Sequence, residues 1–313
     1  MLKITKSLLE LDSLPIYLAG HLKPDQDSIC SCLALAKFLT SLNKKAYVLI
    51  EKKDMDLLDW KKDYSLICSE VNDIEYNFIA LDLNEKSRLG IYEKDFDNAK
   101  FKINIDHHQN NKYEANLTHS KPSMSSTCEI IYQIISSYSK TSLTKDICEY
   151  LYSGILNDTN CFSRRLSNKT LTITQELINH DIDYIHILKE TYSKRSLYEF
   201  KALAKLVNEI QYDGFHYVII DKQKEEFNKL THNQIVKKIA EDLRKIEDID
   251  IFILLIKNDD LITGKCMTNK CEIANKIAEL FNGGGHKKEA GFTIKESIEN
   301  ILKTIKTYLK NPH

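Results

Sequence analysis

Three consecutive residues in the first half of the chain, Asp106, His107 and His108, carry side chains that can bind a metal ion or transfer a proton. They directly follow Phe101–Ile105, where apolar and polar residues alternate with the period of a half-buried strand. Ligand sites in α/β sheets commonly form at the ends of strands. Carboxylate and imidazole groups together suit Mn²⁺ or Mg²⁺, and imidazole favours Mn²⁺. The triplet therefore predicts a metal site at the end of this strand.

A second group of possible ligands, His21, Asp25 and Asp27, follows the apolar segment Pro15–Ala19. The spacing H-x-x-x-D-x-D places three ligands in one short loop between an expected strand and an expected helix. An equally consistent interpretation makes Asp27 a helix N-cap and Asp25 a turn residue after Pro24. Both interpretations stay open when the loop is taken by itself.

Two further carboxylates, Asp82 and Asp158, follow the apolar segments Phe78–Leu81 and Tyr150–Leu156. Each of them alone is typical of a turn or cap residue. Gathered with the ligands above, they would concentrate negative charge that is costly without cations between the carboxylates. The whole set predicts a dinuclear site for two Mn²⁺ ions, with Mg²⁺ or Co²⁺ as substitutes.

Near the C-terminus, Gly283, Gly284 and Gly285 precede His286 and Lys287 and follow an amphipathic segment. A helix C-cap accounts for one of the three glycines. A glycine-rich backbone also lets amide donors approach an anion closely, and His286 and Lys287 add polar or positive groups. These residues alone leave both interpretations open.

The composition limits the classes of function. Among 313 residues, 44 are Lys or Arg and 45 are Asp or Glu, which gives a net charge of -1. This balance argues against a long nucleic acid as partner and favours a small anionic substrate that metal ions neutralise. The eight cysteines include no C-x-x-C pair, as expected of reduced thiols in a cytoplasmic protein. The sequence shows neither a signal-peptide core nor an apolar run of bilayer-spanning length, so we expect no membrane anchor.

The first half of the chain alternates strand and helix signals. Expected strands cover residues 15–19, 46–50, 78–81 and 101–105, and expected helices cover 27–42, 126–137, 145–156 and 171–179. Near-continuous apolar strands separated by helices predict a parallel sheet that is covered on both faces.

Residues 182–210 have a long, charged, helical pattern, and beyond them the alternation restarts. Expected strands cover 215–220, 251–256, 261–267 and 292–294, and expected helices cover 233–246, 272–281 and the C-terminal segment. We therefore expect an α/β protein with a parallel-sheet domain over 1–181, a helical connector over 182–212 and a smaller α/β domain over 213–313. The active site is expected in the cleft between the two domains.

These motifs, taken in order, resemble those of the DHH phosphoesterase superfamily. The four motifs of that family are matched by His21-x3-Asp25-x-Asp27, by Asp82, by Asp106-His107-His108 and by Asp158. The segment Gly283–Phe292 is similar to the G-G-G-H-x-x-A-A-G-F signature of its DHH-associated C-terminal domain. The match covers nearly the whole chain, and the length and plan are similar to the NrnA-type oligoribonuclease and cyclic-dinucleotide phosphodiesterase group.

The resemblance implies a role for each of these residues. One metal ion would be held by His21, Asp25 and Asp82, and the second by Asp27, Asp82, His107 and Asp158, so that Asp82 bridges the two. Asp106 would orient a ligand histidine, and His108 would lie near the scissile phosphate. Substrate would be bound by Gly283, Gly284, Gly285, His286 and Lys287. Apart from the resemblance, Arg164 and Arg165 lie just beyond Asp158 and are candidates for a phosphate contact, although exposed surface arginines are the default interpretation. The resemblance also implies a homodimer formed through the first domain.

The chain departs from the family pattern at several positions. Family members often carry an arginine on the strand before the glycine run, whereas Thr263–Thr268 contains none and Lys265 offers only a point charge. Glu289 replaces the first alanine of the signature, and Asn160 stands where the family frequently has glycine. None of these positions is an expected metal ligand, so the departures concern the substrate rather than catalysis.

The leading hypothesis is a Mn²⁺-dependent phosphodiesterase that hydrolyses short nucleotides to mononucleotides: linear dinucleotides and nanoRNA, cyclic di-AMP, or pAp. A family II inorganic pyrophosphatase is a second hypothesis, because its first motif resembles His21–Ser31. The Gly283–His286 segment argues against it, and so does the lack of an S-R-K-K motif in the second domain. A catalytically silent nucleotide-binding module is a third hypothesis, which the presence of every expected ligand disfavours.

Overall fold

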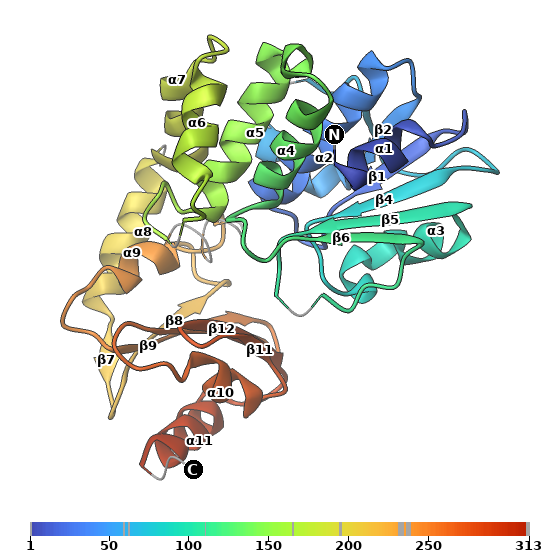
Figure 1. Cartoon of the computed structure of the whole chain (residues 1–313). Helices are drawn as coiled ribbons and strands as arrows, with labels where there is room; N and C mark the ends of the chain where they lie inside the picture. Colours follow the sequence, from blue (N-terminus) through green and yellow to red (C-terminus); the bar gives the residue numbers. More distant parts are fainter. Residues whose placement is uncertain are drawn as a thin grey trace. The chain divides into compact units, whose positions relative to one another are not determined.

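The computed structural model describes residues 2–58, 60–61, 63–109, 111–164, 166–193, 196–230, 235 and 239–310. The chain divides into two compact units, Met1–Lys194 and Arg195–His313, which are shown in Figure 1. Each unit has a sheet and hydrophobic core of its own. None of the helices in the described ranges is long and apolar enough to cross a bilayer.

The first unit is built on a six-stranded sheet in which every neighbouring pair of strands is parallel. Its order is β3 (Ile67–Cys68), β2 (Ala46–Leu49), β1 (Ile16–Ala19), β4 (Asn77–Leu81), β5 (Phe101–Asp106) and β6 (Leu117–Ser120). This arrangement confirms the predicted parallel sheet. The strand order reverses between β1 and β4, the position at which open α/β sheets bind ligands.

Helices cover both faces of this sheet, which explains why its central strands are apolar on both sides. The helices of the first unit are α1 (Lys3–Leu9), α2 (Gln26–Ser41), α3 (Glu93–Asn98), α4 (Thr127–Tyr138), α5 (Lys145–Asp158), α6 (Thr170–Ile178) and α7 (Tyr184–Leu188). Figure 1 shows α2, α4 and α5 on one side of the sheet and α3 on the other. Leu18 of β1 belongs to the core beneath α2, whereas its neighbour Tyr17 belongs to the core that contains Phe96 of α3.

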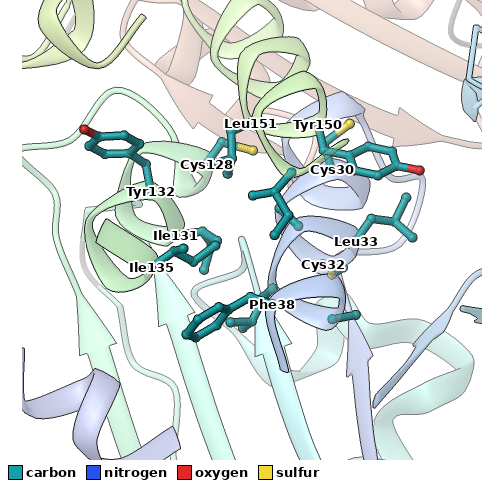
Figure 2. Packing of buried hydrophobic residues seen from close by; sticks show 14 of the residues in the cluster. Cys30, Cys32, Leu33, Phe38, Cys128, Ile131, Tyr132, Ile135, Tyr150 and Leu151 are labelled. Atoms are coloured by element: carbon teal, nitrogen blue, oxygen red, sulfur yellow. The ribbon is translucent and has the colours of Figure 1, made fainter. Parts of the chain in front are cut away.

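The contact among α2, α4 and α5 is the centre of the larger core, and it holds the helix termini that carry site residues. Figure 2 shows side chains from these helices facing one another: Cys30, Leu33 and Phe38 from α2, Cys128, Ile131 and Ile135 from α4, and Tyr150 and Leu151 from α5. All eight are buried. The sequence pattern predicts these three helices to within two residues at each end, but it does not predict α1, β3 or β6.

The second unit contains a mixed six-stranded sheet. Its order is β11 (Gly284–His286), β12 (Glu289–Ile294), β10 (Leu261–Thr268), β9 (Ile251–Asn258), β8 (His216–Asp221) and β7 (Gln211–Tyr212). Only β8 and β9 are parallel among these pairs. Helices α8 (Leu197–Asn208) and α9 (Ala240–Arg244) pack on one side, and α10 (Ala274–Glu279) and α11 (Ile298–Lys310) contribute to the core on the other.

Two stretches expected to be helical differ from the prediction. Part of the helix expected over 233–246 lies outside the described residues, and α9 is its described portion. The stretch 182–212 is shared between the units, since Ile187 of α7 belongs to the first core and Leu206 of α8 to the second. The described residues also form short 3-10 and π helices, among them η1 (Lys52–Leu58), η2 (Lys86–Tyr92), η3 (Lys140–Ser142) and η4 (Lys189–Ser193).

Candidate metal centre

The candidate site lies at the edge of the first sheet where β1, β4 and β5 end. His21 comes two residues after β1, Asp82 comes directly after β4, and Asp106 is the last residue of β5. Because β1 pairs with β4 and β4 pairs with β5 in parallel, these strand ends are neighbours. Asp82 has a left-handed backbone with φ of 63°. Such a conformation in a residue other than glycine often marks a functional position.

The start of α2 supplies two more carboxylates. Asp25 is the N-cap of this helix, and its side chain accepts a hydrogen bond from the Ser28 amide at 3.0 Å. Asp27 lies in the first turn and is fully buried. The interpretation of Asp27 as the N-cap is therefore wrong, because Asp25 has that role.

The Asp27 carboxylate contacts the N-terminus of α4, about a hundred residues further along the chain. Its Oδ2 accepts a hydrogen bond from the Thr127 amide at 2.7 Å, and its Oδ1 accepts one from the Cys128 amide at 2.9 Å. The Thr127 hydroxyl donates to Oδ1 of Asp82 at 3.1 Å. The positive end of α4 thus faces two buried carboxylates and partly offsets their charge.

Three overlapping groups of side chains could each hold a metal ion. They are His21, Asp25 and Asp82; Asp27, Asp82, His107 and Asp158; and Asp82, His107 and His108. Within each group the ligand atoms lie within 4.8 Å of one another. The structure thus brings together all six residues expected to be ligands, and Asp82 belongs to all three groups.

The two oxygens of Asp82 face different histidines. His21 Nε2 lies 3.5 Å from Asp82 Oδ2, and His107 Nε2 lies 3.5 Å from Asp82 Oδ1. His21 Nε2 is also 3.9 Å from Asp25 Oδ1, and His107 Nε2 is 3.0 Å from Asp158 Oδ2. A carboxylate whose oxygens diverge toward two sets of ligands has the arrangement needed to bridge two ions.

Asp106 orients the second histidine of the triplet. Its Oδ1 lies 2.7 Å from His108 Nδ1, and its Oδ2 accepts a hydrogen bond from the Asn111 side chain at 2.7 Å. Burial lowers the pKa of His108, but the bond to Asp106 and the charge of Asp82 outweigh it, so that this pKa lies above its ordinary value. Burial raises the pKa of Asp106, yet the contacts with His108 bring it below its ordinary value.

The charge distribution of the site fits cations. Burial and the neighbouring Asp158 and Asp82 raise the pKa of Asp27 well above its ordinary value. The pKa of Asp158 is raised as well, first by burial. Although burial opposes it, the nearby carboxylates raise the pKa of His107. Without metal ions, these raised values favour the protonated forms, and a divalent cation would compete with those protons.

This protonation predicts how metal binding and stability depend on pH. Folded-state pKa values above the unfolded values mean that these groups favour the fold when protonated, and this contribution is lost as the pH rises through the raised values. Saturating Mn²⁺ should therefore raise the melting temperature more at about pH 8 than at about pH 5.5, with a gain of about 2.7 kcal/mol at a hundredfold excess over Kd. Thermal unfolding with Mn²⁺ or with a chelator tests this, and an equal shift at both pH values would contradict it.

Sequence reasoning missed several residues that support the site. Thr127 lies far from the motifs along the chain, whereas Asn111 follows His108 by three residues and Gly154 precedes Asp158 by four. In all three cases the contact with a site carboxylate is seen only in the folded chain. Gly20 does carry a local signal, because it directly precedes His21. A Cβ at Gly20 would lie 1.8 Å from the Ser28 hydroxyl oxygen. This oxygen accepts a hydrogen bond from the His21 amide at 3.1 Å.

Part of the glycine run of the second unit forms an edge strand, which the sequence pattern does not predict. Gly284, Gly285 and His286 form β11, which pairs antiparallel with β12. Close packing accounts for two of the glycines: a Cβ at Gly283 would lie 2.3 Å from the Gly291 carbonyl oxygen, and one at Gly285 would lie 2.6 Å from a backbone atom. Apart from Gly284 and its two chain neighbours, no atom of the described residues lies within 4 Å of a Cβ built at Gly284, and His286 and Lys287 are exposed. This strand can therefore still present polar groups to a ligand.

Two departures from the family pattern contact each other. Lys265 of β10 forms an ion pair with Glu289 of β12 at 2.8 Å, so its charge is offset within the sheet. Arg164, which lies beyond α5, is exposed, and Arg165 lies outside the described residues. The expected cleft between the domains stays a prediction.

Comparison with known families now identifies the class. Residues 15–155 match the N-terminal domain of the DHH family, and residues 215–311 match the DHHA1 domain. The matched residues contain five of the six candidate ligands. The sixth, Asp158, lies three residues beyond the end of the first match. The chain therefore belongs to the DHH family of phosphoesterases, as its motifs predict.

Individual relatives share this two-domain plan. The chain is 25% identical to a probable bifunctional oligoribonuclease and PAP phosphatase, NrnA, of Streptococcus mutans, over 94% of this chain and 95% of that protein. It is 24% identical to the cyclic-di-AMP phosphodiesterase PdeA of Listeria monocytogenes, over 98% of this chain and 50% of PdeA. A solved structure of an exopolyphosphatase-related protein from Bacteroides fragilis superimposes with a TM-score of 0.85 at 21% identity, covering 97% of this chain and 94% of the other. This last likeness supports the fold.

Proposed function

We propose that the protein is a Mn²⁺-dependent phosphodiesterase that hydrolyses short nucleotides at a site with two metal ions. The observation that supports this most is the sharing of Asp82 among three groups of potential ligands. A single structural ion would need only one such group. Two groups joined by a common carboxylate are typical of enzymes that hydrolyse phosphate esters.

In this proposal, His21 and Asp25 complete one ion site and Asp27, His107 and Asp158 complete the other. The bound ions would lower the pKa of an attacking water and neutralise charge on the phosphoryl oxygens. The chain itself holds the ligands in place: Asp25 through the first turn of α2, and Asp27 through two amides of α4. With these carboxylates already fixed, little rearrangement is needed when the ions bind.

His108 is proposed to face the phosphate. The Asp106 carboxylate can only accept, so Nδ1 of His108 donates to it and Nε2 is the nitrogen available for the substrate. A raised pKa favours the protonated imidazole, whose Nε2–H can donate a hydrogen bond to a phosphoryl or leaving-group oxygen.

Replacing Asp106 with Asn should move the alkaline limb of the kcat profile to lower pH. The carboxylate that raises the pKa of His108 would be gone, while the burial that lowers it would remain. If activity needs the protonated imidazole, kcat at about pH 8 should fall about 10- to 100-fold, the usual cost of losing such a partner. A pH series of kcat measures this. A variant whose alkaline limb stays where it is in the parent protein would refute the role of His108 as a proton donor.

The second unit is proposed to bind the nucleotide. Because Gly284 has no side chain, the space next to this residue of β11 is open. His286 and Lys287 are exposed polar residues close to it in the sequence. Arg164 of the first unit is proposed to add a phosphate contact. We also propose that the enzyme acts in the cytoplasm as a homodimer, and the presence of eight unbridged thiols agrees with a reducing compartment.

The choice of short nucleotides rests on charge and on relatives. A net charge of -1 is unsuited to the many phosphate contacts that a long nucleic acid needs. The relatives from S. mutans and L. monocytogenes are named for oligoribonucleotides, PAP and cyclic di-AMP. We therefore propose linear dinucleotides, nanoRNA, cyclic di-AMP and pAp as candidate substrates.

A competition assay with Mn²⁺ tests this function. Purified protein is given pApA, a longer nanoRNA, cyclic di-AMP, pAp and pyrophosphate, and the products are separated. We expect mononucleotides from at least one nucleotide substrate and little orthophosphate from pyrophosphate. Preferred cleavage of pyrophosphate would favour a pyrophosphatase instead, and a lack of turnover with every substrate would favour a binding module.

A further inference from the structure

Thr127, the first residue of α4, contacts two site carboxylates at once. Its amide donates to Oδ2 of Asp27 at 2.7 Å, and its hydroxyl donates to Oδ1 of Asp82 at 3.1 Å. Thr127 and Asp27 are fully buried, and Asp82 is 2% exposed. One residue thus links a carboxylate from α2 to the carboxylate that follows β4.

The position of Thr127 in its helix explains why both donors are available. The amides of the first turn of a helix have no partner within the helix. Ser126 caps α4 by accepting the Glu129 amide at 3.2 Å, which leaves the amides of Thr127 and Cys128 directed at Asp27. The hydroxyl of Thr127 must be the donor toward Asp82, because an ionised carboxylate only accepts.

We propose that Thr127 is a positioning residue that fixes the orientation of the shared carboxylate of Asp82 toward two divalent cations. This inference rests on the proposed function. Asp82 must direct Oδ1 toward His107 and Oδ2 toward His21, each 3.5 Å away, if it is to join the two groups of ligands. Rotation of the carboxylate about its Cβ–Cγ bond would remove both oxygens from these directions. The hydrogen bond from the Thr127 hydroxyl to Oδ1 opposes that rotation, because the rotation would move Oδ1 away from its donor.

The contact also explains how the carboxylates stay close before a metal binds. Asp27 and Asp82 repel each other, and this repulsion contributes to the raised pKa of Asp27. Both donors of Thr127 face this pair, so the residue stabilises the arrangement that the cations require. Removal of the hydroxyl leaves the amide contact with Asp27 intact and releases only Asp82.

Three substitutions separate the hydroxyl from the rest of the side chain. Thr127→Val keeps the shape but loses the donor, Thr127→Ala loses the donor without placing a methyl group against Asp82, and Thr127→Ser keeps the donor. Thr174→Val is a matched control, because the Thr174 hydroxyl is buried in the same unit but donates to the Thr170 carbonyl of its own helix at 2.8 Å.

Calorimetric titration with Mn²⁺ and steady-state kinetics on the preferred nucleotide are measured for all four variants. In Thr127→Val and Thr127→Ala we expect Mn²⁺ affinity and kcat to fall about 10- to 100-fold, with a smaller change in KM. Thr127→Ser should restore most of the loss, and Thr174→Val should match the parent protein.

Each other outcome overturns the proposal in a distinct way. Parent-like Mn²⁺ affinity in both Thr127→Val and Thr127→Ala would show that the hydroxyl does not position Asp82. If their metal-free melting temperatures fall while Mn²⁺ affinity and kcat stay at the parent values, the role of Thr127 is structural only. If the parent protein itself binds no Mn²⁺, the proposed function fails, whatever the variants do.

Discussion

Replacing Asp82 with Asn is expected to reduce kcat by more than the roughly 10- to 100-fold typical of residues that only orient a ligand. Asp82 belongs to all three groups of candidate ligands, so this one change weakens both proposed ion sites. The amide keeps the size of the side chain and an oxygen that can accept from Thr127. Asparagine also tolerates the left-handed backbone at this position. Kinetics with saturating Mn²⁺ and a melting curve without metal measure the effect.

The alanine variant at the same position is the matched comparison. Asp82→Ala should be equally inactive, but it should also be less stable than Asp82→Asn by about 1–2 kcal/mol, because alanine disfavours a φ of 63°. If Asp82→Asn folds normally and keeps more than about a tenth of the parent kcat, Asp82 does not bridge two catalytic ions.

Replacing Gly154 with Ala is expected to destabilise the first unit, although alanine normally favours a helix interior by about 0.8–1.0 kcal/mol over glycine. A Cβ at this position in α5 would lie 2.3 Å from the Cys128 sulfur and 2.9 Å from Oδ1 of Asp27. Neither neighbour can move easily, since Cys128 is in the core and Asp27 is held by α4. We expect a loss of about 1–3 kcal/mol in the free energy of unfolding, together with weaker Mn²⁺ binding.

A second substitution separates the two clashes. Cys128→Ala removes the sulfur atom, so the double variant Gly154→Ala/Cys128→Ala should regain part of the stability. Mn²⁺ affinity should recover less, because the contact of the new methyl group with Asp27 remains. Denaturant unfolding and Mn²⁺ titration of the single and double variants measure both effects. Unchanged or increased stability in Gly154→Ala alone would contradict the close packing described here.

Three of the six candidate ligands could be recognised from sequence because they follow strands. A strand produces a local alternation of apolar and polar residues, and parallel strands bring their ends to one edge of the sheet. His21, Asp82 and His107 could therefore be grouped without a structure. Asp158 could not be placed correctly in this way, because it is the last residue of α5 rather than a residue beyond it.

The residues that support the ligands could not be predicted, since their roles depend on contacts between distant parts of the chain. Thr127 and Asp27 are 100 residues apart, and nothing near either residue indicates the hydrogen bond between them. The strand β11 was not predicted for another reason. Glycines are depleted in strands, so the sequence did not predict a strand at Gly284 and Gly285, whereas the structure pairs them with Gly291 and Ala290 in a sheet.

The Asp-His-His triplet shows both what the sequence predicts and what only the tertiary contacts show. Its location at the end of β5 follows from the sequence, and so does its suitability for metal. The resemblance to the family suggested that Asp106 orients a ligand histidine. The contact in the structure is with His108, and Asn111 fixes the other oxygen of Asp106. The carboxylate thus supports the histidine that we propose to face the phosphate.

The central claim, that one shared carboxylate joins two ion sites, is tested most directly by titrating the metal-free protein with Mn²⁺. Calorimetry counts the bound ions, and electron paramagnetic resonance reports whether they are magnetically coupled. We predict two Mn²⁺ ions per chain with a coupled signal, as expected for ions about 3.5–4 Å apart, and loss of the coupling in Asp82→Asn. A single bound ion, or two ions without coupling, would contradict the proposed dinuclear centre.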